Sequence, residues 1–463
     1  VTFRIEILYI RVTLKKVQYG EDEAVMEISA KNNLKQAAEE HLVRFGGDKF
    51  DNLFSSARGS IVVDDTGREI LDFTSGQMCA TVGHNHPAIV TAVEEAGKRA
   101  LHMFSGMIPE VVAELGLRLA SWLPAPLKKS LFVNTGSESN EAALRMAKMY
   151  TGGHEVLALG GSWHGTGAGA ASVSYASDRK GYGPTMPGVY VMPEPNSYRC
   201  PIEHCRDFCD KTCQRIGLSM YDMASRGEGA AIIAEPIISA GGVLVPPDDY
   251  FTSLKKEAEK RGMLLILDEA QTAFGRIGKK FGSERFNTIP DIMTVSKTLG
   301  GGIPLAAAIT SDEIEISVHN KGFTFYTSHV ADPLPAQVGL AVLATIEKEN
   351  LINRAADSGG YLKGLLKDLQ QKYECIGDVR GEGLLLGVEL VKDRESREPD
   401  HRLGALTTDR CFELGLSMNI RRRPERGSVW RIAPPLNVSL NELDRGVAIL
   451  DQALSESLDK LAN

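Results

Sequence analysis

The hydrophobic positions between about residues 130 and 310 form short apolar runs separated by longer amphipathic segments. Runs such as residues 263–267 are continuously apolar, which is typical of strands buried on both faces of a parallel sheet. The regular alternation of strand and helix patterns predicts one mostly parallel, seven-stranded sheet with helices on both faces. The expected strands are 130–133, 155–159, 188–192, 230–234, 263–267, 291–295 and 305–310.

The two ends of the chain follow a different pattern. Residues 29–45 have helical periodicity, and residues 59–73 contain two β-rich runs around an Asp-Asp-Thr-Gly turn, which predicts a hairpin. Beyond about residue 335, a long helical region precedes strand patterns in 376–390 and a terminal helix.

We therefore predict an α/β fold with two domains. The large domain covers 81–335, and a smaller α+β domain combines 29–80 with 336–463. Residues 1–28, which begin without Met, are expected to be an extension outside the fold.

Composition narrows the class of protein. The chain has 463 residues, of which 43% are hydrophobic, enough for a large core. The net charge of −8 argues against nucleic acid as a partner. No apolar stretch approaches the roughly 18 residues that span a bilayer, so a membrane protein is not expected. The seven cysteines favour reduced thiols over a disulfide framework, and we therefore expect a cytoplasmic protein.

Two polar residues stand where such sheets bind ligands. Asp268 follows the apolar run 263–267, and Lys297 lies 29 residues later, one strand–helix–strand unit along the chain. Pyridoxal phosphate requires this pair, because the lysine amine attaches to its aldehyde and the carboxylate keeps its pyridine nitrogen protonated. The pair therefore predicts a pyridoxal-phosphate enzyme.

Four further residues extend this candidate site. Gly136 and Ser137 open a helix after a strand, where N–H groups and a hydroxyl favour an anion such as a phosphate, although the same stretch also fits an ordinary capping box. Trp163 is either a stacking partner for the pyridine ring or a core residue. Gln271 is either a hydrogen-bond donor to the cofactor's phenolic oxygen or an exposed loop amide.

Five motifs, each at the end of an expected strand, carry a family resemblance: Asn-Thr-Gly-Ser-Glu-Ser-Asn-Glu (134–141), Ser-Trp-His-Gly (162–165), Ala-Glu-Pro-Ile (234–237), Leu-Asp-Glu-Ala-Gln-Thr-Ala-Phe-Gly-Arg (267–276) and Ser-Lys-Thr-Leu-Gly-Gly-Gly-Ile-Pro-Leu (296–305). The chain resembles the class III (ω-) aminotransferases of the fold-type-I pyridoxal-phosphate superfamily. This resemblance implies pyridoxal 5′-phosphate as cofactor, small amino and keto acids as substrates, and Asn140 and Ser328 as further cofactor-binding residues. It also implies a homodimer or homotetramer with the active site between subunits.

Within the class, the chain is most similar to the 2,2-dialkylglycine decarboxylases. That resemblance implies conversion of a 2,2-dialkylglycine, such as 2-aminoisobutyrate, to a ketone and CO2, with amino transfer to pyruvate. The residues that carry it are 71–78 (Leu-Asp-Phe-Thr-Ser-Gly-Gln-Met), 102–107 (His-Met-Phe-Ser-Gly-Met), 325–336, 376–389, 414–420 and 431–436 (Arg-Ile-Ala-Pro-Pro-Leu).

The decarboxylase resemblance assigns roles to three residues. It implies that Gln77 holds the carboxylate that leaves, that Arg431 clamps a carboxylate that stays, and that Lys297 protonates the product carbon. A neutral amide can hold a leaving carboxylate without the strong ground-state stabilisation that an arginine would give. From the residues alone, Gln77 is better explained as a loop amide that bonds its own backbone, and Arg431 is equally well explained as a structural ion-pair member.

The same resemblance implies an activating alkali cation, potassium, beside the active site. The matching ligands are the hydroxyls of Ser105 and Ser328, the carboxylate of Asp332 and the backbone oxygens of Met103 and Val330. Such an all-oxygen set suits a hard monovalent cation. Ser328 stands where threonine is usual, and in the class this hydroxyl also reaches the phosphate of the neighbouring subunit.

Other interpretations stay open at this point. The chain is alternatively an ω-aminotransferase that removes a proton and releases no CO2, or a non-catalytic pyridoxal-phosphate-binding protein. Thr166 and Ala240 depart from the decarboxylase pattern and point to a different substrate side chain.

One cysteine cluster and one basic run remain outside the site. If residues 203–215 are helical, Cys205, Cys209 and Cys213 share a face near Cys200 and could bind zinc, although Cys-x2-Cys pairs are absent. Otherwise they form a reduced, partly buried helix face. The arginine-rich run 421–426 either steers anions or is a solvated loop.

Overall fold

The computed structural model describes residues 34–44, 52–176, 181, 183–206, 208–423 and 427–462, with only the backbone at 421–423. The chain divides into two compact units, residues 1–55 with 63–68 and residues 56–62 with 69–463. The expected extension over 1–28 lies outside the described residues. Residues 424–426 of the basic run also lie outside them.

The first unit contains the predicted helix and turn. Residues 34–41 are helical. The turn forms because the Asp64 carboxylate accepts hydrogen bonds from the backbone N–H groups of Thr66 and Arg68, at 2.9 and 3.0 Å. Strands β1 (Phe54–Arg58) and β2 (Ile61–Asp64) have residues in both units.

The second unit contains the seven-stranded sheet, in the order β4-β10-β9-β8-β7-β5-β6. Strand β10 is antiparallel to both of its neighbours, and the remaining pairs are parallel. The mostly parallel α/β sheet is thus confirmed, and each expected strand is found within one residue of its predicted bounds. The strands are β4 (Lys129–Val133), β5 (Glu155–Leu159), β6 (Val189–Met192), β7 (Gly229–Ala234), β8 (Leu264–Asp268), β9 (Ile292–Val295) and β10 (Ala306–Thr310).

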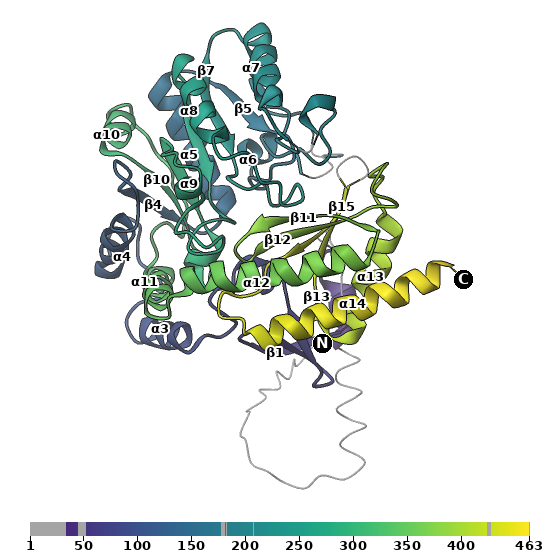
Figure 1. Cartoon of the computed structure of the whole chain (residues 1–463). Helices are drawn as coiled ribbons and strands as arrows, with labels where there is room; N and C mark the ends of the chain where they lie inside the picture. Colours follow the sequence, from purple (N-terminus) through teal and green to yellow (C-terminus); the bar gives the residue numbers. More distant parts are fainter. Residues whose placement is uncertain are drawn as a thin grey trace, which may run out of the picture. The chain divides into compact units, whose positions relative to one another are not determined.

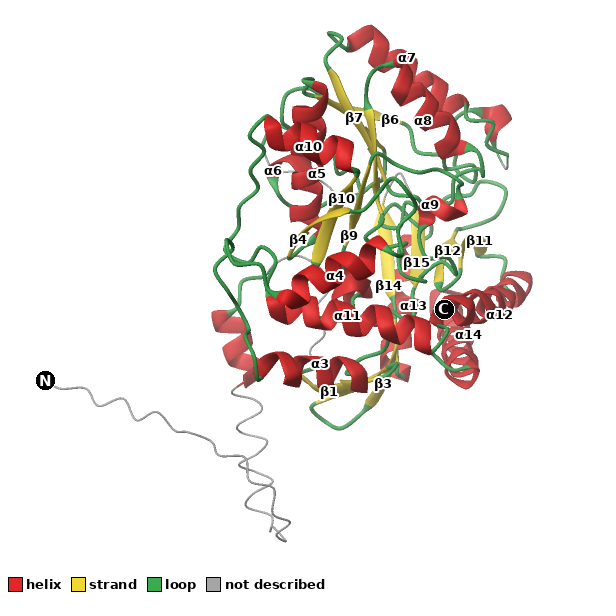
Figure 2. Ribbon diagram, turned by 90° about the vertical axis from the view of Figure 1, so that its left-hand side faces the viewer, coloured by secondary structure: helices red, strands yellow, loops and turns green. Residues whose placement is uncertain are grey.

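Helices cover both faces of this sheet (Figure 2). Neighbouring residues of a strand point to opposite faces, which explains why strands buried on both sides are continuously apolar. Val156 and Ala158 of β5 pack with helices α5 (Gly136–Thr151) and α10 (Asp312–Asn320). Leu157 and Leu159 pack instead with α7 (Thr212–Ala224) and α8 (Tyr250–Lys260).

A second, antiparallel sheet has the order β11-β12-β15-β14 and lies beside the helices α12, α13 and α14 (Figure 1). Near it, β3 pairs in parallel with β13, so residues from the two ends of the chain meet in this unit. The predicted domain boundaries stay a prediction. The elements are β3 (Glu69–Asp72), α12 (Leu351–Lys372), β11 (Ile376–Glu382), β12 (Leu385–Leu390), α13 (His401–Leu414), β13 (Leu416–Ser417), β14 (Asn419–Arg423), β15 (Gly427–Ile432) and α14 (Leu440–Ala462).

The other helices and 3₁₀ turns of this unit are named here by their bounds. They are α2 (Ser75–Met78), α3 (Pro87–Gly97), α4 (Glu110–Ala120), α6 (Ala168–Ser172), the 3₁₀ turns η1 (Glu203–Cys205) and η2 (Lys297–Gly300), α9 (Gly282–Arg285) and α11 (Pro333–Lys348). No helix in the described part of the chain combines the length and apolar character needed to cross a membrane.

The considered helix over 203–215 is wrong. Among the described residues of this range, only the turn η1 and the start of α7 are helical, because Lys211 has a left-handed backbone with φ of 66°. The Asp210 carboxylate also accepts the backbone N–H of Thr212 at 2.8 Å, which fixes the start of the helix. The four cysteines therefore do not lie along one helix face.

Candidate active site

Three polar residues lie at or just after the carboxyl ends of three adjacent strands of the large sheet. Glu235 follows β7, Asp268 ends β8, and Lys297 comes two residues after β9. These strands are parallel neighbours, with Asp268 opposite Thr294 in the register, so their carboxyl ends meet. Lys297 has a positive φ of 47°, an uncommon conformation for a residue with a side chain that is concentrated at functional sites.

Asp268 is buried and held in its charged form. Its Oδ2 accepts hydrogen bonds from Asn140 Nδ2 and His164 Nδ1, both at 2.8 Å, and its Oδ1 accepts from the backbone N–H of Ala270 at 3.0 Å. Burial acts to raise the pKa of Asp268, but the hydrogen bond and charge of His164 outweigh it and the pKa is lowered. A permanent negative charge is therefore available at this point.

Lys297 lies close enough to several charged groups to respond to them. Burial lowers the pKa of the Lys297 amine, and the nearby Asp268 carboxylate opposes that effect. Cys79 and Glu235 also raise the pKa, whereas the positive charge of Arg431 lowers it. A larger share of the amine is consequently neutral than for a lysine in water.

The start of helix α5 forms the other end of the site. Thr135 and Glu138 form the capping box that the sequence also allowed. The N–H groups of Gly136 and Ser137 in the first turn have no partner within the helix. A Cβ on Gly136 would lie 2.9 Å from Ser296 Oγ, so a larger residue here would require the Ser296 hydroxyl to move.

Ser137 connects this helix start to the loop after β5. Its Oγ accepts hydrogen bonds from the backbone N–H groups of Thr166 and Gly167, at 3.1 and 2.9 Å, which leaves its own O–H to donate. A Cβ on Gly165 would come within 2.6 Å of Ser137, so this glycine allows the Trp163 loop to pass directly over α5. The phosphate-binding and stacking candidates are therefore adjacent.

A buried polar network adds residues that the sequence analysis did not assign. Glu235 accepts the backbone N–H of Trp163 at 2.8 Å, and Gln271 Nε2 lies 3.4 Å from the same carboxylate. Gln271 Oε1 in turn accepts from Ser239 Oγ and from Arg431 Nη1, both at 2.9 Å. Burial raises the pKa of Glu235 to about 7.

The network joins the two sheets, since Arg431 is in β15 and Gln271 follows β8. Glu235 and His164 were present in the quoted motifs Ala-Glu-Pro-Ile and Ser-Trp-His-Gly. The available signal was their position directly after a strand, the same signal that identified Asp268.

Gln77 lies in the short helix α2 and is exposed. Its segment is tied to that of Arg431, because Ser75 Oγ donates to the backbone oxygen of Ala433 at 2.5 Å. Cys79, two residues after Gln77, influences the pKa of Lys297. The segment therefore borders the site, while the role of the Gln77 amide stays a prediction.

The segments that contain the predicted cation ligands form hydrogen bonds that the sequence did not predict. The carboxylate of Asp332 is buried and accepts from His102 Nδ1 at 2.7 Å and from His329 Nδ1 at 2.6 Å. The Ser105 hydroxyl donates to the Tyr326 hydroxyl at 2.6 Å. The two histidines were not anticipated, and their nitrogens differ from the expected all-oxygen set. Met103, Ser328 and Val330 lie in the same two segments, 102–105 and 326–332.

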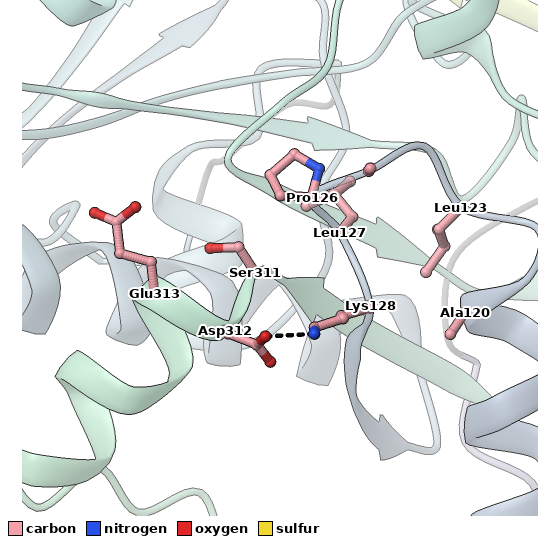
Figure 3. A pocket seen from close by; sticks show the side chains of 9 residues that line it. Ala120, Leu123, Pro126, Leu127, Lys128, Ser311, Asp312 and Glu313 are labelled. Carbon is pink, nitrogen blue, oxygen red and sulfur yellow. Dashed lines mark ion pairs between the residues drawn. The ribbon is translucent and has the colours of Figure 1, made fainter.

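A surface pocket of about 530 Å³ lies at the opposite ends of the strands from Lys297 (Figure 3). Lys128, before β4, forms an ion pair with Asp312, after β10, and both line the pocket. Because β10 runs antiparallel to β9, its end faces away from Lys297. No candidate site residue lines this pocket, and we do not assign the chemistry to it.

The described residues fit pyridoxal phosphate. The helix start at Gly136 and Ser137 suits a phosphate, the ionised Asp268 suits a protonated pyridine nitrogen, and Lys297 supplies the amine. Asn140, in the first turns of α5, donates a hydrogen bond to Asp268, so this helix contacts the carboxylate directly. Pyridoxal phosphate is the cofactor expected of a site with this donor set.

Comparison with known proteins agrees with this geometry. The chain is 44% identical to an uncharacterized aminotransferase of Schizosaccharomyces pombe, over 90% of this chain and 94% of that protein. It is 35% identical to a leucine/methionine racemase of Thermococcus litoralis, over 86% of this chain and 90% of the racemase. A Bacillus anthracis aminotransferase structure superimposes with a TM-score of 0.87 and 28% identity, covering 92% of this chain and 99% of that chain.

These relatives do not support the expected closeness to 2,2-dialkylglycine decarboxylase. The fold is nevertheless that of the fold-type-I pyridoxal-phosphate transaminases. The model of one family, aminotransferase class-III, matches residues 46–454. The chain therefore belongs to the class-III aminotransferase family.

Proposed function

We propose that the protein removes the Cα proton of a small amino acid and transfers the amino group to a keto acid. The observation that carries this proposal is the placement of Lys297 beside the ionised, buried Asp268, with Arg431 near enough to lower the pKa of the lysine. Pyridoxal phosphate, when bound, supplies the sink for the electron pair left at Cα. The racemase relative supports proton loss, because racemisation breaks the same Cα–H bond.

Each residue has a defined task in this proposal. Lys297 takes the Cα proton and returns it, which its lowered pKa favours near neutral pH. With pyridoxal phosphate bound, Asp268 would keep a positive charge on the pyridine nitrogen, and Trp163 would pack against the ring. The planar guanidinium of Arg431 holds the substrate carboxylate, which it can bind through two parallel hydrogen bonds.

Decarboxylation-coupled transamination of a 2,2-dialkylglycine is a second candidate. The supporting observation is the hydrogen bond between Ser75 and Ala433, which keeps the segment of Gln77 next to that of Arg431. In this alternative the Gln77 amide holds the carboxylate that leaves. The named relatives are an aminotransferase and a racemase, so the first candidate has the better support.

One experiment separates these activities. The holoenzyme is incubated in D2O with L-alanine and 2-oxoglutarate, and in parallel with 2-aminoisobutyrate and pyruvate. Amino transfer with deuterium incorporation at Cα of alanine, lost in Lys297→Ala but retained in Gln77→Ala, supports the first proposal. Stoichiometric CO2 and acetone from 2-aminoisobutyrate, lost in Gln77→Ala, would establish the second candidate instead.

Two further outcomes have distinct meanings. D-Alanine formed without a keto acid identifies a racemase. If no reaction occurs, although the cofactor is bound and Lys297 is intact, both candidates fail and a non-catalytic binding protein is indicated.

An alkali cation at Asp332 remains part of the proposal. The buried carboxylate supports it, and His102 and His329 each contact one of its two oxygens. We expect potassium to increase activity relative to lithium at equal ionic strength. An Asp332→Asn variant that keeps the same potassium response would remove this carboxylate from the cation site.

We also propose a homodimer or homotetramer. Large apolar side chains on the segments around the predicted cation ligands are exposed in the single chain, with Ile108 at 81% and Tyr326 at 73%. Covering them with a second copy would bury apolar area at roughly 25 cal/mol per Å². Light scattering of the wild type and of Ile108→Asp tests this, and a wild-type monomer would contradict it.

A further inference from the structure

A histidine, a cysteine and an aspartate converge in the segment between β6 and α7. Among the described residues, His204, Cys205 and Asp210 are one of two groups whose possible ligand atoms all lie within 4.8 Å of one another. Helix α7 packs against β6, the edge strand of the large sheet. Four strand steps separate β6 from β9, which is about 19 Å across the sheet. The group is therefore separate from the proposed active site.

The structure changes the set of ligands that the sequence suggested. The spacing of the cysteines allowed a zinc site on one helix face, but the left-handed Lys211 interrupts that helix. In the described part of the chain, neither Cys209 nor Cys213 belongs to a group of three possible ligands. Cys205 is grouped instead with one imidazole and one carboxylate.

The carboxylate of Asp210 is the centre of this group. Its Oδ1 accepts hydrogen bonds from Cys205 Sγ at 2.9 Å and from the backbone N–H of Thr212 at 2.8 Å. Its Oδ2 lies 3.3 Å from His204 Nε2. The hydrogen bond from Thr212 is the kind of second contact that orients a metal-binding carboxylate. The start of α7 therefore holds Asp210 in place beside the other two side chains.

The spacing of the three side chains is close to that of a tetrahedral zinc site. Zinc binds sulfur at about 2.3 Å and nitrogen or oxygen at about 2.0–2.1 Å, which places nitrogen about 3.3 Å from oxygen and sulfur about 3.5 Å from both. The distance between His204 Nε2 and Asp210 Oδ2 already has this value. Cys205 Sγ lies within 4.8 Å of the other ligand atoms, so its distances exceed the tetrahedral values by at most about 1.3 Å. Rotation of the side chains can supply a shift of that size.

The types of the three donor atoms point to the class of ion. A thiolate and an imidazole suit a borderline-soft divalent ion such as zinc, whereas calcium, magnesium and potassium require oxygen ligands. When the ion binds, the Cys205 thiol releases its proton to solvent and binds as a thiolate. That thiolate and the Asp210 carboxylate together neutralise the two positive charges of the ion.

Two basic side chains near the group leave room for a cation. The ammonium group of Lys211 forms an ion pair with Asp249. Arg215 Nη2 lies 3.6 Å from Asp210 Oδ2, but the Arg215 side chain is 66% exposed and can turn into solvent. Repulsion by these groups therefore does not prevent binding.

We propose that His204, Cys205 and Asp210 bind one zinc ion and that water completes its tetrahedron. Cys205 is fully buried, whereas His204 is exposed and Asp210 is half-buried, so water has access to the fourth position. The ion links the turn η1 to the start of α7, on either side of Lys211. Because this segment is distant from Lys297, the zinc stabilises the segment and takes no part in amino transfer.

The first test measures zinc binding by the holoenzyme. Tag-free protein is stripped with a chelator, incubated with equimolar zinc, separated by gel filtration and analysed by elemental mass spectrometry. We expect about one zinc per chain in the wild type. In competition with a chromogenic chelator, His204→Gln and Cys205→Ser should weaken binding by about 100-fold or more. A wild type that retains no zinc overturns the proposal.

Asp210→Asn separates loss of the metal from loss of the fold. Asparagine keeps an oxygen that can accept the Thr212 N–H and cap α7, but it removes the negative charge. We expect this variant to remain folded, with an unchanged circular dichroism spectrum, and to bind zinc at least about 10-fold more weakly. Undiminished zinc affinity in the folded variant overturns the assignment of Asp210.

Two other histidines serve as controls. His154 Nδ1 lies 2.7 Å from Glu228 Oε2, but this pair has no third ligand among the described residues, so His154→Gln should keep the zinc. The second group with three possible ligands contains His329. Zinc that is lost in His329→Gln but retained in His204→Gln belongs to that group and overturns the proposal. Equal retention by all variants shows an adventitious ion only and also overturns it.

Cobalt reports directly on the sulfur ligand. Cobalt(II) bound in place of zinc should give a thiolate-to-metal charge-transfer band in the near ultraviolet. Cys205→Ser should abolish this band, whereas Cys375→Ser, which replaces a buried cysteine outside the segment, should leave it unchanged. A cobalt complex without the band excludes Cys205 as a ligand and overturns the proposal.

Discussion

Replacing Glu235 with glutamine tests the polar network at the centre of the candidate site. Glu235 is 2% exposed and accepts the backbone N–H groups of Trp163 and Ser239, at 2.8 and 3.2 Å. Glutamine has nearly the same shape and is neutral at every pH. The substitution therefore removes the titration of this site while changing the packing little.

The magnitude follows from the pKa of the buried carboxyl. Burial raises the pKa of Glu235 from its ordinary value of 4.5 to about 7. Since a tenfold change in acidity is about 1.4 kcal/mol, ionising this group costs roughly 3 kcal/mol more in the folded chain than in the unfolded one. Between the two pKa values only the folded chain holds the proton. The stabilisation is complete below pH 4.5 and is lost as the pH rises through 7.

The assay compares unfolding free energies of the wild type and Glu235→Gln in the cofactor-free chain. Urea unfolding at pH 5 and pH 8 should show that the variant gains roughly 2 kcal/mol relative to the wild type between these values. One lost or reversed hydrogen bond adds an offset of about 1 kcal/mol at both pH values and cancels in this comparison. The exposed Glu94→Gln serves as the control.

A difference between variant and wild type that does not change with pH would refute the reasoning. It would mean that Glu235 is charged in the folded chain and that its three hydrogen bonds outweigh burial. The slopes of the unfolding curves must agree between the proteins, because an altered slope would indicate a change in the unfolded state rather than in this site.

Three further predictions concern the cofactor and substrate residues. Asp268→Asn removes the charge that supports the pyridine nitrogen, and kcat should fall by about 100-fold or more, measured with saturating cofactor. Ser137→Ala should raise the Kd for pyridoxal phosphate by about 10-fold in absorbance titrations, because one hydrogen bond to a charged group is lost. Arg431→Lys should raise KM for amino acids but not for simple amines, since lysine cannot form the paired contact to a carboxylate. An equal effect on both donor classes would contradict that role.

The sequence located the large sheet because the evidence for it is local. A strand buried on both faces must be apolar at successive positions, and residues 231–233 and 265–267 show this directly. The helix considered over 203–215 failed because the left-handed Lys211 interrupts it, and a periodicity of cysteines carries no information about that backbone angle.

The same local evidence was enough for Asp268 and Lys297, since each follows an apolar run at the edge where parallel strands end. What only the tertiary structure decided is which polar groups meet them. His164 reaches Asp268 from the loop after β5, and Arg431 reaches Gln271 from the other sheet. Those contacts depend on strand order, register and the packing of distant segments, and they set the charge on each group through burial and hydrogen bonding. The contacts of each polar group, and hence its charge, depend on the whole fold. They can therefore be assigned only from the tertiary structure.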